Sequence, residues 1–140
     1  MALNIREKGA AAEREVAKIH NLFFEQHGLV DSTGKPLILK RNLMQTAQGG
    51  YDLIGVSFLA LEVKRKEKLS LPEWWRQTTK QAACGQSPVL WFKQSRKPWR
   101  VILPVDIGLP EKPLTKDLLK SEVTIERYFK WLKGKIENER

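Results

Sequence analysis

Cysteine and histidine are scarce in this 140-residue sequence, which contains Cys84 as its one cysteine and His20 and His27 as its two histidines. One cysteine excludes a disulfide within the chain, and so few thiol and imidazole groups exclude a zinc site of the usual Cys/His kind. Both histidines fall in an amphipathic helical stretch with no partner ligand nearby in the sequence. We therefore expect them at the surface or rim rather than as metal ligands.

Hydrophobic runs of membrane-spanning length are also absent, and the N-terminal segment shows no apolar core or cleavage pattern of a signal peptide. These two absences lead us to expect a cytoplasmic protein without a membrane partner. A hydrophobic fraction of 41% is enough for folding without disulfides or a structural metal. The length suits a single domain, residues 1–140.

Acidic residues are fewer than basic ones. The sequence has 16 Asp and Glu and 25 Lys and Arg, which gives a net charge of +9. Residues 62–100 carry ten Lys or Arg against three Asp or Glu, so this segment alone supplies +7 of the excess. Such an excess favours a polyanionic partner, either nucleic acid or an anionic membrane. On charge alone, a solvated basic face is an equal alternative.

The hydrophobic pattern predicts eight secondary-structure elements in the order α-β-β-β-α-β-β-α. The predicted helices cover residues 5–27, 72–84 and 121–137, and the predicted strands cover residues 37–41, 51–56, 58–64, 89–92 and 99–104. This order predicts a single α/β domain with a central mixed sheet flanked by helices.

Two features of this layout bear on partners. Trp74 and Trp75 are adjacent in a predicted helix, so we expect at most one of them in the core and the other at a dimer interface or on DNA. The proline-rich stretch 104–113 would let the last helix dock separately, as part of a C-terminal helical extension at about 114–140.

Charged residues interrupt an otherwise apolar pair of predicted strands. Glu62 and Lys64 lie two residues apart, so both side chains point to one face of their strand. If the two strands form a hairpin with its turn near Ser57, Asp52 falls directly opposite Glu62. Two opposed carboxylates repel each other, and a divalent cation such as Mg²⁺ removes that cost by taking oxygen ligands from both.

Each of these residues has a simpler interpretation when taken alone. An isolated Glu-x-Lys is usually a surface ion pair, and an Asp at the start of a strand is usually a turn residue. The combination favours a site, since charges within a run of buried apolar residues are seldom there for stability. An ammonium such as that of Lys64 beside a metal can orient an attacking water and offset phosphate charge.

The arrangement of Asp52 with Glu62-Val63-Lys64 resembles the PD-(D/E)xK nuclease superfamily, which has a restriction-endonuclease-like fold. The stretch KGAAAERE, Lys8–Glu15, is similar to the opening helix of archaeal-type Holliday junction resolvases, and Pro88–Ile102 is similar to two later strands of those enzymes. The resemblance covers residues 6–104 and leaves the C-terminal extension without an implied role.

This resemblance implies a role for each matching residue. Glu13 would hold the water shell of the metal, and Asp52, Glu62 and the main-chain carbonyl of Val63 would be direct ligands of Mg²⁺, with Mn²⁺ able to substitute. Lys64 would position the nucleophile. The residues that we expect to contact nucleic acid are Lys8, Arg14, Arg41, Gln48, Lys66, Arg76, Gln77 and Lys80.

The leading hypothesis is therefore a structure-selective DNA endonuclease that resolves four-way junctions. Paired cuts in a two-fold substrate need two active sites, so a homodimer is implied. Two alternatives stay open. One is another PD-(D/E)xK nuclease, either an exonuclease or a nicking enzyme, and the other is a non-catalytic nucleic-acid-binding protein with the same fold.

Overall fold

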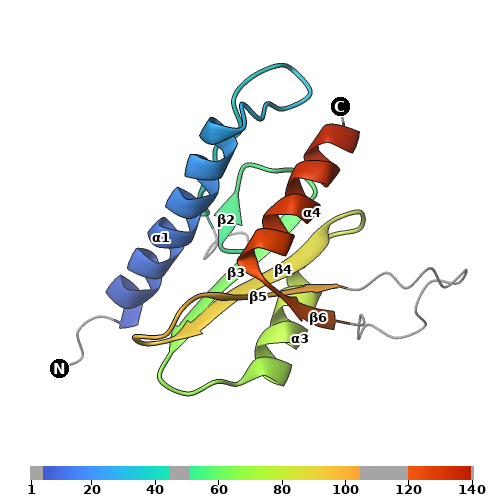
Figure 1. Ribbon diagram of the computed structural model, residues 1–140. Coiled ribbons are helices and arrows are strands. Elements are labelled where there is room, and N and C mark those ends of the chain that lie inside the picture. The colour runs from blue at the N-terminus through green and yellow to red at the C-terminus, as the bar shows by residue number, and fades with distance from the viewer. Residues whose placement is uncertain (1–4, 45–50, 105–119, 140) are drawn as a thin grey trace, which may run out of the picture.

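The computed structural model describes residues 5–44, 51–104 and 120–139 of the chain. In chain order the elements are α1 (Ile5–Gln26), β1 (Lys40–Arg41), β2 (Leu53–Ile54), β3 (Leu59–Lys66), α3 (Leu71–Gln81), β4 (Ser87–Gln94), β5 (Arg100–Pro104), β6 (Lys120–Val123) and α4 (Ile125–Asn138) (Figure 1). The predicted α/β class with a mixed sheet and flanking helices is confirmed.

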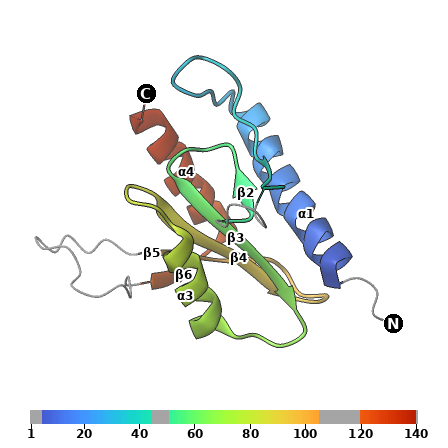
Figure 2. The same ribbon diagram turned by 180° about the vertical axis from the view of Figure 1, so that it is seen from behind.

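The six described strands form one sheet in the order β1-β2-β3-β4-β5-β6. Every pair of neighbouring strands is antiparallel except β3 and β4, which are parallel. A parallel pair needs a crossover, and α3 supplies it. Helices α1 and α4 lie on one face of the sheet and α3 lies on the other, as the two opposite views show (Figures 1 and 2). No described helix is long and apolar enough to cross a bilayer.

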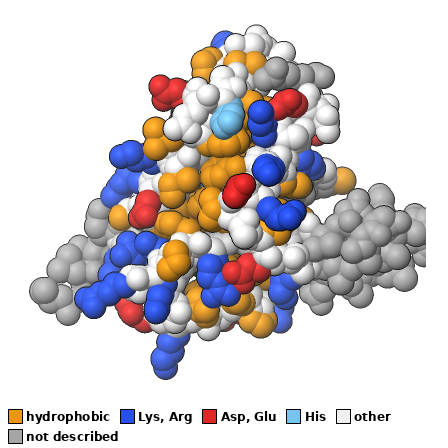
Figure 3. All heavy atoms as spheres, viewed as in Figure 1, with side chains coloured by type: hydrophobic (Ala, Val, Ile, Leu, Met, Phe, Trp, Pro, Cys, Tyr) orange, Lys and Arg blue, Asp and Glu red, His pale blue; other side chains and the backbone are white. Residues whose placement is uncertain are grey.

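Alternation along β3 and β4 divides the core between the two faces of the sheet. Odd-numbered residues such as Leu61 and Trp91 pack in the larger cluster with α1 and α4, and even-numbered residues such as Leu90 and Phe92 pack under α3. Hydrophobic side chains fill the seam between α1 and α4, and charged side chains lie on both sides of it (Figure 3).

His20 lies in this larger core, and our expectation of a surface or rim position for it was wrong. Its side chain is fully buried. Its Nδ1 donates to the carbonyl of Val16 at 2.8 Å, and its Nε2 lies 2.7 Å from the Tyr128 hydroxyl, which donates to it in this tautomer. Burial lowers the pKa of His20 to about 4, so the ring is neutral and links α1 to α4.

The tryptophan pair on α3 also differs from expectation. Trp74 and Trp75 are both buried, with 6% and 4% of their surface exposed, and both belong to the cluster under α3. Adjacent residues of a helix are about 100° apart, and an apolar stripe of that width accommodates both. The described structure therefore leaves neither ring exposed for a DNA base.

The C-terminal region begins with a strand rather than the predicted helix. Residues 120–123 form β6 and pair with β5, and α4 starts only after Thr124, whose side chain accepts from the Arg127 amide at 3.1 Å. The buried side chains of Leu132 and Ile136 place α4 in the main core. The stretch 104–113 lies outside the described residues beyond Pro104, so its predicted role is untested.

Gly55 fixes the path of the chain after β2. Its φ of +135° is rarely adopted by L side chains, and a Cβ at this position would overlap the carbonyl oxygen of Ile38. We expect Gly55→Ala to lower the free energy of unfolding by about 2–3 kcal/mol. Gly134 on α4 has open space, and Gly134→Ala should instead stabilise by about 1 kcal/mol. Urea unfolding of both variants checks this, and a Gly55→Ala variant as stable as the wild type would contradict it.

Candidate active site

The hairpin formed by β2 and β3 places Asp52 beside Glu62. Leu53 is paired with Leu61, so the register is centred on Ser57 as the sequence predicts. The Asp52 amide donates to the carbonyl of Leu61 at 3.0 Å and extends the ladder past the end of β2. The Asp52 carboxylate is held in place, because its Oδ2 accepts from the Val63 amide at 2.8 Å.

Both carboxylates are buried, with 6% of Asp52 and 2% of Glu62 exposed. Glu62 is in register with Leu90 of β4, which belongs to the cluster under α3. Glu62 therefore replaces what would be another apolar side chain on this face of the sheet. A carboxylate costs free energy at such a position unless it is neutral, paired or bound to a metal.

Lys64 lies next to Glu62 on the same face of β3. Its Nζ is 3.8 Å from Glu62 Oε1, which is longer than a hydrogen bond, and 19% of its side chain is exposed. Burial, followed by the nearby Asp52, raises the pKa of Glu62 to about 9. The Lys64 charge lowers this pKa but does not offset the burial. Without a cation, Glu62 is therefore a neutral acid rather than a full ion-pair partner.

Glu13 lines the same pocket as Asp52, Glu62 and Lys64. It comes from α1, which lies on the face of the sheet opposite to α3 (Figures 1 and 2). Its Oε1 accepts from Arg41 Nε of β1 at 2.9 Å, and both side chains are partly buried. Burial raises the pKa of Glu13, although the hydrogen bond from Arg41 acts in the opposite direction. Asp52 raises the pKa of Glu13 and Lys64 lowers it, so the three groups interact electrostatically.

The four predicted catalytic residues line one pocket of about 390 Å³. The residues around this pocket are Lys8, Gly9, Glu13, Asp52, Glu62, Val63, Lys64, Arg65, Lys66, Glu67 and Ser95. Lys8 and Lys66 are exposed, and Lys8 Nζ lies 3.9 Å from Glu67. The pocket thus combines an acidic floor with basic side chains that reach solvent, which suits a phosphate that must approach a cation.

The donor set of this pocket fits one divalent cation. Asp52 and Glu62 offer carboxylate oxygens from adjacent strands, and a bound cation would remove the cost of ionising Glu62. Within the described ranges, no group of three or more His, Cys, Asp or Glu side chains is already arranged around a metal position. Glu13 is held by Arg41, so the fit rests on the two strand carboxylates.

The other predicted DNA-contacting residues are spread more widely. Arg14 and Arg41 line a second groove between α1 and β1. Arg76, Gln77 and Lys80 are exposed on α3, and Gln48 lies outside the described residues. Sequence reasoning missed Ser95, which follows β4 and donates from its amide to the carbonyl of Lys66 at 3.3 Å. Only the parallel pairing of β3 with β4 brings it to the pocket, and no local pattern signals that pairing.

A family model described as "Phage putative PDDEXK endonuclease" matches residues 4–139. The chain belongs to this family. Membership confirms the predicted PD-(D/E)xK superfamily and supports a nuclease that acts on DNA with a divalent metal. It does not extend to the predicted likeness to Holliday junction resolvases. A comparison with curated proteins found no match.

Proposed function

We propose that this PD-(D/E)xK family member is a metal-dependent DNA endonuclease whose catalytic residues are Glu13, Asp52, Glu62 and Lys64. The observation that carries the proposal is the pair of buried carboxylates on neighbouring strands, with a lysine 3.8 Å from one of them and basic side chains at the pocket entrance. Burying these charged groups lowers the stability of the fold, and a catalytic role in phosphodiester hydrolysis explains why they are there.

Asp52 and Glu62, with the main-chain carbonyl of Val63, would hold the cation. When bound, the cation supplies Lewis-acid stabilisation of phosphate charge and a nucleophilic water at neutral pH. The Lys64 ammonium orients the attacking water and offsets charge that develops on the phosphate. Glu13 accepts hydrogen bonds from water at the pocket entrance, and Arg41 sets the orientation of its carboxylate.

The finer part of the proposal is that the substrate is branched DNA, with a four-way junction as the first choice, and that the active form is a homodimer. The support for this choice is the resemblance of Lys8–Glu15 and Pro88–Ile102 to junction resolvases. Two cuts related by a two-fold axis need two copies of this site. We propose Mg²⁺ as the cation, with Mn²⁺ able to replace it.

A cleavage assay on a four-way junction, a nicked duplex and a linear duplex tests the proposal. We expect cutting in Mg²⁺ or Mn²⁺ and none in EDTA. In Ca²⁺ we expect binding without cutting, because Ca²⁺ coordinates more loosely. Fragment lengths separate an endonuclease, which gives internal cuts, from an exonuclease, which gives mononucleotides.

The outcomes discriminate the alternatives. Full activity in EDTA would overturn the metal mechanism. DNA binding without cutting in any metal would favour the non-catalytic protein. Equal cutting of all three DNAs would leave the endonuclease in place and remove the preference for branched substrates. Sedimentation of the protein with and without junction DNA tests the homodimer.

A further inference from the structure

A second groove of about 360 Å³ lies between α1 and β1, on the outer side of the main core, and shares no lining residue with the active-site pocket. It is lined by Arg14, Ala17, Lys18, Asn21, Leu22, Glu25, Leu39, Lys40 and Arg41. Four of these side chains are cationic and one is acidic. Leu22, which is 49% exposed, offers an apolar surface for the aliphatic stems of the lysines.

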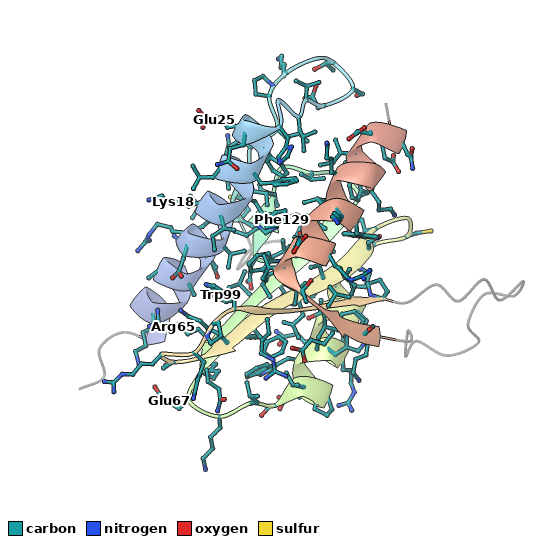
Figure 4. All side chains as sticks on the ribbon, viewed as in Figure 1. Lys18, Glu25, Arg65, Glu67, Trp99 and Phe129 are labelled. Atoms are coloured by element: carbon teal, nitrogen blue, oxygen red, sulfur yellow. The ribbon has the colours of Figure 1, made fainter. Side chains whose placement is uncertain are left out.

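Two basic side chains of α1, those of Arg14 and Lys18, line this groove. Arg14 and Lys18 are four residues apart, so they lie on the same face at a rise of about 6 Å. This rise is comparable with one to two nucleotides of a DNA strand, whose charges repeat about every 3.4 Å along the duplex axis. Lys18 and Glu25 project from the side of α1 that faces away from Phe129 and α4 (Figure 4).

The two walls of the groove are held together by Asn21. Its Nδ2 donates to the carbonyl of Leu39 at 3.0 Å, and its Oδ1 accepts from the Leu39 amide at 2.8 Å. This pair of hydrogen bonds takes the place of a neighbouring strand for the chain that leads into β1. The groove is therefore preformed, and a ligand does not have to order its walls.

Arg41 joins the groove to the active-site pocket. It lines the groove, and its Nε donates to Glu13 Oε1, which lines the pocket. A polyanionic chain that lies over the carboxylate pocket can therefore continue past the Glu13–Arg41 pair onto Lys40, Lys18 and Arg14. The basic entrance residues Lys8 and Lys66 belong to the pocket rather than to this groove.

We propose that the groove between α1 and β1 binds the phosphate backbone of the DNA strand that flanks the cut phosphate, with Lys18 and Lys40 each contacting one phosphate. The proposal rests on the proposed nuclease function and adds the path of the substrate outside the active site. Such contacts set the position of the strand and carry no base-sequence information.

The test is DNA binding by the full chain in Ca²⁺, measured by fluorescence anisotropy with a labelled duplex over a range of salt. The test variant is Lys18→Ala with Lys40→Ala, and both side chains are exposed. The matched control is Lys130→Ala with Lys133→Ala on α4, which removes the same charge. Between 1 M and about 0.1 M salt, each phosphate contact raises the logarithm of the binding constant by about 0.9. Loss of two contacts should therefore weaken binding at about 0.1 M salt roughly 60-fold.

For the test variant, we also expect the plot of log affinity against log salt to have a slope that is shallower by about 1.8. The control variant should bind with an affinity close to that of the wild type. Lys18→Arg with Lys40→Arg keeps both charges and should recover most of the affinity. A thermal melt confirms that each variant is folded. Equal affinity of test and control variants would overturn the groove assignment and leave the nuclease intact. A wild-type protein that neither binds nor cuts DNA would instead overturn the proposed function itself.

Discussion

Replacing Lys64 by alanine is expected to lower the rate of DNA cleavage by about 100-fold or more while the affinity for DNA stays near that of the wild type. The Lys64 Nζ lies beside the buried carboxylates, and the side chain is only 19% exposed. Its charge is therefore placed to act on the reacting phosphate rather than on the DNA surface at large. Single-turnover cleavage in Mg²⁺ and anisotropy in Ca²⁺ measure the two quantities separately.

Lys68→Ala is a suitable control, because Lys68 is an exposed lysine of the same segment and does not line the pocket. It should cut at close to the wild-type rate. Asp52→Asn should match Lys64→Ala in its loss of cutting. The amide oxygen can still accept from the Val63 amide, so the hairpin is retained. A Lys64→Ala variant that cuts like the wild type would show that Glu62 and Lys64 form only a structural pair.

The central part of the site could be predicted because it depends on local geometry. A hairpin of β2 and β3 needs only the position of its turn, and counting outward from Ser57 places Asp52 against Glu62. The two-residue period of a strand then puts Lys64 on the same face. These are short-range rules, and no distant part of the chain has to be known for them to apply.

The errors arose where a distant segment decides the outcome. His20 is buried because Tyr128, 108 residues later, gives its ring a hydrogen-bonding partner. Residues 120–123 carry mostly polar side chains, and only the free edge of β5 makes them a strand. The hydrogen bond from Arg41 to Glu13 joins a two-residue strand to a helix, and no sequence pattern in either segment predicts it.

Glu62 provides a further test that needs no DNA. Burial raises its pKa from 4.5 to about 9, so without a cation the folded protein holds a proton that the unfolded chain releases above pH 4.5. The folded-state pKa is the higher one, so this contribution to stability is fully present below about pH 4.5 and is lost as the pH rises toward 9. Each pH unit in this window lowers the free energy of unfolding by about 1.4 kcal/mol at most.

Glu62→Gln keeps the shape of the side chain and removes the ionisation. In EDTA we expect the variant and the wild type to have similar stability near pH 5, and the variant to be more stable near pH 8 by on the order of 2–4 kcal/mol. Urea unfolding at the two pH values measures the difference. Glu73→Gln is the matched control, because it makes the same chemical change at an exposed glutamate. Its free energy of unfolding should depend on pH as that of the wild type does.

Divalent cations complete the experiment, because they separate a metal ligand from a carboxylate that is merely buried. A cation bound by Asp52 and Glu62 favours the ionised form of Glu62, so adding Mg²⁺ at pH 8 should restore stability to the wild type by mass action and have less effect on Glu62→Gln. If Mg²⁺ stabilises both proteins equally, the cation binds elsewhere. If the two proteins show the same dependence on pH in EDTA, Glu62 is already ionised in the folded state, and the cost that a metal would relieve does not exist.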